Sequence, residues 1–225
     1  MNALGKFIFV TSASTPNLSP EALARLVLLA TYTPWGKNCL RLTQRRGMTK
    51  ADLASVLRLS TATANRFFNE ASPAYLVEGA DGTLSMRGNL CRHGQLSKEG
   101  RQSWRKLYVD TFRSLYAHAR PSQHKLIGYL LGQLGALNLE HNCLCRNPAE
   151  IDPKLVEPLT AQEFCAAIGH DPSNFSRLRR YYESLRFEHA GCYYKPVVFG
   201  KDGIWVNPRV SYNGGNYAPL LRRFK

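Results

Sequence analysis

The sequence has no long apolar run. No stretch of about 18 consecutive apolar residues occurs, which argues against a membrane span. Near the N-terminus, the apolar run 7–10 follows a single lysine and is too short for the core of a signal peptide. The six cysteines lack the dense, regular spacing of a secreted disulfide framework. These absences predict a cytoplasmic protein with reduced thiols and no membrane partner.

Acidic residues are also scarce. The chain has 16 Asp and Glu against 30 Lys and Arg, so its formal net charge is +14. This excess is larger than solubility requires and predicts an anionic partner, with nucleic acid as the first candidate. A merely basic surface is the alternative. Hydrophobic residues make up 44% of the chain and aromatic residues 11%, so we expect it to fold around a hydrophobic core.

Motifs of common catalytic chemistries are missing. The sequence contains no Walker-type Gly-Lys-Ser/Thr loop, no Gly-x-Ser-x-Gly elbow and no paired-carboxylate motif. Tyr181 and Tyr182 lie beside arginines, as a strand-transfer tyrosine would, but no histidine pair accompanies them. We interpret these tyrosines as helix residues that pack on the core. We therefore expect neither catalysis nor a cofactor.

One group of residues resembles the ligands of a zinc ion. Cys91 and His93, together with Cys143 and Cys145, would supply enough ligands if their two segments met in space. Structural zinc sites usually use cysteine pairs two to four residues apart in a knuckle, and this spacing differs. We expect that these four residues do not share a metal, with a zinc site as the alternative.

The first half of the chain has the pattern of a helix-turn-helix. The segment 20–32 is a predicted helix, because Ser19 can cap it and apolar residues recur at helical spacing. After a polar loop, a short helix follows Thr49. A tight turn then leads to Ser60, which can cap a further helix over 61–69.

The same pattern recurs in the second half. Thr49 and Ser60 correspond to Thr160 and Asp171, a shift of 111 positions, and Arg66 corresponds to Arg177. The turn and strand at 81–86 match 202–207, and Pro20 matches Pro121. Each half therefore has the order helix, helix, helix, hairpin, which is typical of a winged helix. A duplication is the simplest explanation.

The segment 97–119 lies between the two halves. Its aromatic and aliphatic residues, from Trp104 to Tyr116, follow helical spacing, which predicts a connecting helix. We interpret the aromatic stripe as core, with a homodimer contact as the alternative. The sequence thus predicts an α+β, mostly helical chain with two tandem winged helix-turn-helix domains, 1–96 and 121–225, joined by a connecting helix at 97–120.

DNA-contacting candidates lie in the last helix of each motif, because its first turns carry hydrogen-bond donors and no carboxylates. They are Ser60, Thr61, Thr63, Asn65 and Arg66 in the first half, and Ser173, Asn174, Ser176, Arg177 and Arg180 in the second. The phosphate-contacting candidates are Arg41, Arg45, Arg46, Lys50 and Arg179.

The segments 48–66 and 203–215 resemble winged-helix proteins of plasmid and phage replication and regulation, such as RepL-like replication proteins and MarR-like regulators. The Val-Asn-Pro strand at 206–208, which runs on to an aromatic residue and Gly215, carries the likeness in the second half. The first half departs from this pattern at 86–89, so we expect a degenerate first wing. The resemblance implies a winged-helix fold with recognition helices at 60–69 and 171–181.

The sequence predicts a double-stranded DNA-binding protein, namely a transcriptional regulator or a replication initiator of a plasmid or phage. The alternative is a protein-interaction module, for example a phage inhibitor of a host nucleic-acid enzyme, whose basic surfaces capture a protein partner. A DNA-binding protein loses affinity as salt rises, because binding releases counterions from the phosphates.

Overall fold

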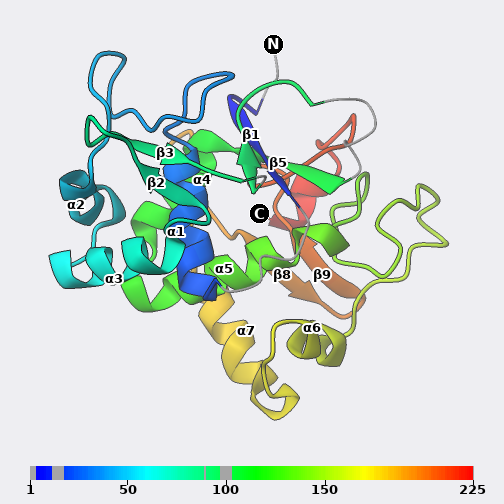
Figure 1. Ribbon diagram of the computed structural model, residues 1–225. Helices are drawn as coiled ribbons and strands as arrows, with labels where there is room; N and C mark the ends of the chain where they lie inside the picture. Colours follow the sequence, from blue (N-terminus) through cyan, green and yellow to red (C-terminus); the bar gives the residue numbers. More distant parts are fainter. Residues whose placement is uncertain (1–3, 12–17, 89, 97–102, 225) are drawn as a thin grey trace.

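The computed structural model describes residues 4–11, 18–88, 90–96 and 103–224. The fold is α+β, as the sequence predicts, with helices packed beside small antiparallel sheets (Figure 1). The first half contains β1 (Phe7–Thr11), α1 (Pro20–Ala30), η1 (Lys50–Asp52), α2 (Leu53–Leu57), α3 (Thr61–Ala71), β2 (Leu76–Glu78), β3 (Leu84–Met86) and β4 (Cys91–Arg92). The second half contains β5 (Trp104–Tyr108), α4 (Val109–His118), η3 (Pro121–Gln123), α5 (His124–Gly132), η4 (Leu134–Ala136), α6 (Ala161–Ala167), η5 (Pro172–Asn174), α7 (Phe175–Ser184), β6 (Phe187–His189), β7 (Cys192–Tyr194), β8 (Val197–Gly200), β9 (Gly203–Val206) and η6 (Leu220–Phe224).

The helix starts follow the capping residues predicted from the sequence. Ser19 accepts a hydrogen bond from the backbone N–H of Ala22, and Ser60 accepts one from Thr63. Asp171 caps the short turn η5, which leads directly into α7. Each cap satisfies a backbone donor that the first turn of a helix leaves without a partner.

Both predicted hairpins are present. The first joins β2 to β3, with Val77 opposite Ser85, and the second joins β8 to β9, with Val198 opposite Trp205. Alternating residues of β3 bury one face of that strand. The expected degeneracy of the first wing at 86–89 stays a prediction, and residue 89 lies outside the described residues. The second half also carries an additional hairpin, β6–β7, between α7 and β8.

A second repeat, the tripeptide Asn-Cys-Leu, occurs at 38–40 and again at 142–144. In both halves this tripeptide runs along the outer strand of the hairpin and adds a third, short strand segment to it. The bonds are Leu40 N to Leu84 O (2.8 Å) and Met86 N to Asn38 O (2.8 Å) in the first half, and Leu144 N to Ile204 O (2.8 Å) and Val206 N to Asn142 O (3.0 Å) in the second.

Corresponding elements of the two halves contact each other. Strand β1 pairs antiparallel with β5, with Phe9 opposite Lys106. Helix α1 packs closely on α5, where Gly128 lies against the backbone of Pro20. This is the arrangement that a two-fold axis between the halves would produce. A single hydrophobic cluster accordingly contains buried residues of both halves.

The predicted connecting helix is partly wrong. A helix is present, but α4 begins only at Val109, and 104–108 forms strand β5; residues 97–102 lie outside the described residues. Within β5 the side chains alternate, with Arg105 and Leu107 buried and Lys106 partly exposed. This period of two allows the strand to pair with β1, a partner about 97 positions away that the local pattern does not reveal.

Burial in the helix-turn-helix segments follows the prediction at most positions. Five residues expected in the core are buried, and Ile168 is half-buried at the edge of the cluster. The five are Leu53, Leu57, Phe67, Phe164 and Leu178. Tyr182 is fully buried and donates a hydrogen bond to the carbonyl oxygen of Leu126, as expected of a core tyrosine. The same expectation is wrong for Tyr181, which is 46% exposed because it lies one position away round the helix. Within the described ranges, no helix has the length and apolar character to cross a membrane.

Candidate nucleic-acid interface

Helix α3 has one buried face and one polar face. Ala64, Phe67 and Phe68 pack into the core, whereas Asn65 and Arg66 are exposed. Ala62 and Asn69 complete the outward surface, because they lie four positions before and three positions after Arg66 and so share its side of the helix. Neither residue was among the predicted DNA contacts. The exposed centre of α3 is therefore polar and carries a single positive charge.

Helix α7 has the same arrangement with more positive charge. Leu178 and Tyr182 are buried, and Ser176, Arg177 and Arg180 are exposed on the opposite side. Arg177 is held by Tyr181, whose hydroxyl accepts a hydrogen bond from the guanidinium at 3.0 Å.

Arg180 is free to contact a ligand. Within the described part of the chain, Arg180 takes part in no ion pair or hydrogen bond. Arg177 and Arg180 lie three positions apart and therefore project from one side of α7.

Several of the predicted DNA contacts instead stabilise the helix starts. Ser60 and Thr63 are hydrogen-bonded to each other at 2.9 Å, and Thr63 is half-buried. Ser173 donates to the carboxylate of Asp171 through its hydroxyl and its backbone N–H, and these bonds lower the pKa of Asp171. Asn174 also donates to Asp171. Thr61 remains exposed at the start of α3.

Some of the predicted phosphate contacts form ion pairs with acidic side chains and the others do not. Arg46 forms an ion pair with Asp52, and Arg179 pairs with Glu183 at 2.8 Å one turn along α7. The Nζ of Lys50 lies 4.5 Å from the ring centre of Phe68. The remaining two candidates, Arg41 and Arg45, are exposed in the loop that precedes η1. A paired cation neutralises fewer phosphates, so Arg46 and Arg179 are weaker candidates than the sequence alone indicated.

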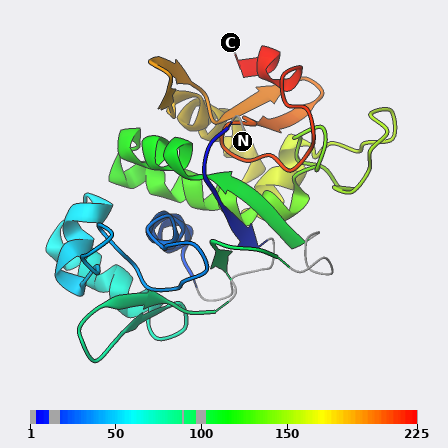
Figure 2. The same cartoon turned by 90° about the horizontal axis from the view of Figure 1, so that it is seen from above.

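The corner between α4 and α5 lies between α3 and α7. Both α3 and α7 lie in the lower half of Figure 1, and Figure 2 shows α4 and α5 between them. Arg58, at the turn before α3, donates to the carbonyl oxygen of Ala117 in α4 (2.8 Å). Gln123 donates to the hydroxyl of Ser184 at the end of α7 (2.9 Å). These bonds fix the position of each exposed helix relative to the shared corner.

A basic cleft of about 760 Å³ lies between this corner and α7. Arg120 and Lys125 line it from the corner, and Arg180 lines it from α7. A hydrogen bond to Tyr129 raises the pKa of Lys125, so this lysine stays charged. The residues that line the cleft include no Asp or Glu. The positive potential of α7 therefore continues onto the corner. Arg120 and Lys125 were not among the predicted contacts.

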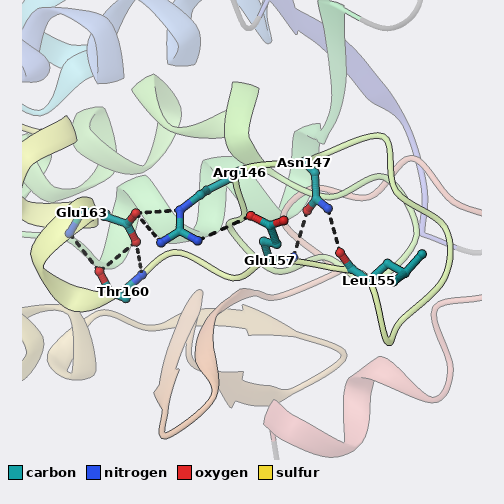
Figure 3. Close-up of polar contacts among 6 residues, drawn as sticks. All are labelled: Arg146, Asn147, Leu155, Glu157, Thr160 and Glu163. Atoms are coloured by element: carbon teal, nitrogen blue, oxygen red, sulfur yellow. Dashed lines mark hydrogen bonds and ion pairs between the residues drawn. The ribbon is translucent and has the colours of Figure 1, made fainter.

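A network of polar contacts fixes the start of α6 and the preceding loop (Figure 3). Arg146 donates to Glu163 at 2.7 Å and lies 3.5 Å from Glu157. Glu163 also accepts hydrogen bonds from the backbone and side chain of Thr160, and these bonds, with the charge of Arg146, lower the pKa of Glu163 to about 2. Asn147 binds the backbone of Leu155 and Glu157. The loop is thereby held in a defined position.

The four candidate zinc ligands lie in two separate places. Cys91 belongs to β4, and His93 bonds to the carbonyl oxygen of Thr33, both in the first half. Cys143 and Cys145 pack in a different cluster with Trp205 and Phe224. Among the described residues, no three potential ligands lie close enough together to hold a metal ion.

The interface thus consists of α3, α7 and the corner between them. Its outward side chains include hydrogen-bond donors and arginines, and both helices pack on a shared core. Surfaces of this type bind phosphates and base edges. Comparison of the chain with protein-family models, curated proteins and solved structures finds no match.

Proposed function

We propose that the chain is a non-catalytic protein that binds double-stranded DNA at specific sequences through two tandem winged-helix units. The supporting observation is the equivalence of α3 and α7. Each helix follows a capped turn, packs one face on the core and directs an arginine outward, Arg66 and Arg177, from matching positions. A hairpin follows each helix, as the wing does in a winged helix.

The contact between the halves implies a target with two parts. Because β1 pairs with β5 and α1 packs on α5, one chain carries two recognition helices in a fixed relation. We infer that each helix enters its own stretch of major groove. The outward residues differ, since Asn65 in α3 corresponds to Ser176 in α7, so the two half-sites differ in sequence. Such a site suits a regulator of transcription or an initiator of replication.

The arginines of α7 have distinct proposed roles. Arg177 lies nearer the start of the helix and is oriented by Tyr181, which suits a contact to the edge of a guanine. Arg180 lies further along and lines the basic cleft with Arg120 and Lys125, which suits contacts to phosphates.

The proposal is tested by selecting a preferred duplex from random sequences and titrating it, and a scrambled duplex, at several salt concentrations. We expect Arg177→Ala to weaken binding to the selected duplex by about 1 to 3 kcal/mol and to relax its sequence preference. Arg180→Ala should weaken binding to both duplexes and lower the salt slope by about one. Arg222→Ala, which removes an exposed charge from η6, is the matched control and should preserve the preference between the two duplexes. Parent-like binding by both α7 variants would refute recognition through α7.

A protein-interaction module is the second candidate, and one observation favours it. The loop held by Asn147 exposes two aliphatic side chains, Ile151 at 73% and Leu155 at 61%. Exposed apolar groups on an ordered loop are typical of a contact with another protein. A response to duplex DNA that does not change with salt would favour this second function over the first.

A further inference from the structure

The three-stranded sheet β4-β1-β5 has an outer face that is unusual for a small sheet. Ile8 and Val10 point inward and are buried, whereas Phe7 and Phe9, on the opposite face of β1, remain partly exposed. Phe9 is paired with Lys106 of β5. The outer face of the sheet therefore carries aromatic rings next to a positive charge, where a solvated sheet face usually carries only polar side chains.

The aromatic rings on this face are ordered by contacts with one another. Phe7 and Phe9 meet edge to face, with ring centres 5.2 Å apart. The Nζ of Lys106 lies 5.4 Å from the ring centre of Phe7. Two rings and one ammonium group thus form a rigid unit on the surface.

Trp35 extends this aromatic surface toward the first half. Its side chain is 58% exposed and has a ring contact. The ring of His93 meets the indole edge to face at 5.4 Å, and His93 is itself held by a hydrogen bond to the carbonyl oxygen of Thr33. A largely exposed indole contributes little to the core, and together with Phe7 and Phe9 it forms an apolar surface that a ligand can contact.

Three adjoining hollows meet at Trp35. The first, of about 650 Å³, is shared with Phe7, Phe9 and Lys106. The second, of about 1190 Å³, extends along Lys6, Arg41 and Arg113, and the third, of about 540 Å³, extends along Lys37 and Arg92. We call the surface formed by these three hollows the Trp35 groove. It is defined by Phe7, Phe9, Trp35, Lys37, Arg92 and Lys106.

The rim of the Trp35 groove is mainly basic. Lysines and arginines line all three hollows, and the acidic residues among the described lining are Asp110 and Glu140. The guanidinium of Arg113 stacks on the ring of Tyr32, with its carbon 4.1 Å from the ring centre. A groove that combines aromatic faces with cations is complementary to bases whose faces are uncovered and to the phosphates that join them.

We propose that the Trp35 groove binds single-stranded nucleic acid, with unpaired bases stacked on Trp35 and on the phenylalanines of β1. A duplex cannot use these rings, because its bases are already stacked on each other. The groove also lies away from α3 and α7, since β1 and β5 are at the top of Figure 1 and those helices are in its lower half. The groove therefore provides a second binding surface that does not depend on the duplex-binding role of α3 and α7.

The test uses the full chain with two labelled probes of about 12 nucleotides, one of oligothymidylate and one of oligouridylate. Binding is followed by anisotropy of the label and by quenching of tryptophan fluorescence. Trp35→Ala should weaken binding at least about fivefold, whereas Trp35→Tyr should retain most of the affinity and lose most of the quenching. Lys106→Glu should weaken binding and reduce its salt dependence. The relative affinity for the two probes distinguishes DNA from RNA as the ligand.

Two controls separate this proposal from its alternatives. Tyr193→Ala removes another exposed aromatic ring, on β7, and should bind the single strands as the parent does. Arg177→Ala should weaken duplex binding and leave single-strand binding unchanged, so the two surfaces can fail independently. Parent-like affinity of Trp35→Ala for both probes would overturn the proposal. So would sedimentation as a dimer that Trp35→Ala converts to a monomer, because a second copy would then cover the groove.

Discussion

Gly128 in α5 offers a direct test of how the two halves are joined. A methyl group at this position would overlap the backbone of Pro20 at the start of α1, lying 2.7 Å from its Cα and nearer still to its carbonyl carbon and oxygen. The obstacle is backbone, which cannot rotate away as a side chain can. Gly128→Ala must therefore push α1 and α5 apart.

The size of the effect can be worked out from this geometry. Ordinary contact needs roughly 3.4 Å between carbon atoms, and the carbonyl oxygen lies nearer to the methyl group than either carbon does, so the helices must separate by more than about 1 Å. A gap of about 1 Å already forfeits up to about half of each dispersion contact along the interface. Overpacking usually costs about 1 to 3 kcal/mol, and a clash with backbone lies at the upper end of this range, about 3 kcal/mol. Alanine regains up to about 1 kcal/mol because it favours helix more than glycine does. We expect a net loss of about 2 kcal/mol in the free energy of unfolding.

Gly132, one turn later in the same helix, provides the matched control. A methyl group there meets no atom within 4 Å, so Gly132→Ala should be neutral or stabilise the protein by up to about 1 kcal/mol. Urea unfolding followed by far-UV circular dichroism measures both variants. A Gly128→Ala protein within about 0.5 kcal/mol of the parent would refute the close crossing of α1 and α5.

Three further predictions concern single side chains. His124 is buried, and its burial and the nearby charge of Arg25 lower its pKa to about 4, so the unfolded chain binds its proton more readily. Stability should therefore fall as pH drops from about 6.5 toward 4, by about 1 to 2 kcal/mol at about pH 5, and urea unfolding of His124→Gln should lack this component. Ser60→Ala should lower the free energy of unfolding by about 1 kcal/mol through loss of the α3 cap, whereas Ser60→Asp should retain the cap; equal stability of all three proteins would contradict this role. Cys192 is exposed while Cys143, Cys145 and Cys165 are buried, so a thiol reagent should modify Cys192 first in the native protein, and Cys192→Ser should abolish that fast phase.

The helices and their caps could be predicted because their signals are local. Ser19, Ser60 and Thr160 lie directly before apolar residues at helical spacing, and each accepts a hydrogen bond from the first turn that follows. The glycine turns at 82 and 203 likewise indicated two hairpins. In all these cases the residues that determine the structure lie within a few positions of one another.

The sheet that joins the halves could not be predicted in the same way. The aromatic spacing around Trp104 and Tyr108 fits a helix as well as a strand over so few residues. The choice depends on β1, whose pairing partner is far away in the sequence. The short strand segments at 38–40 and 142–144 were also missed, although their shared Asn-Cys-Leu tripeptide is a signal that a search for repeats could have found.

The exposed faces of the two candidate helices could be predicted because a helical repeat defines which side chains face outward. Asn65, Arg66, Arg177 and Arg180 are exposed as expected. The sequence did not show that Arg179 is paired with Glu183, because that depends on the rotamers that the two side chains adopt. The Trp35 groove was also out of reach, since it combines four segments that are far apart in the sequence and meet through the pairing of β1 with both β4 and β5.

Two corresponding loops have opposite charge, so in the proposed DNA-binding role we expect the two halves to contribute unequally to the affinity for DNA. In each half, a loop is closed by a backbone hydrogen bond, from Met48 to Leu40 in the first and from Leu159 to Leu144 in the second. The first loop, 41–47, contains three arginines and no acidic residue, whereas the second, 145–158, contains two basic and three acidic residues. In the proposed complex with DNA, phosphates attract the first loop and repel the second, so we expect the second half to obtain its affinity from α7 and the basic cleft. This expectation agrees with the distribution of arginines, since α7 exposes Arg177 and Arg180 whereas α3 has only Arg66. The acidic loop, which exposes Ile151, is then available for a contact other than DNA.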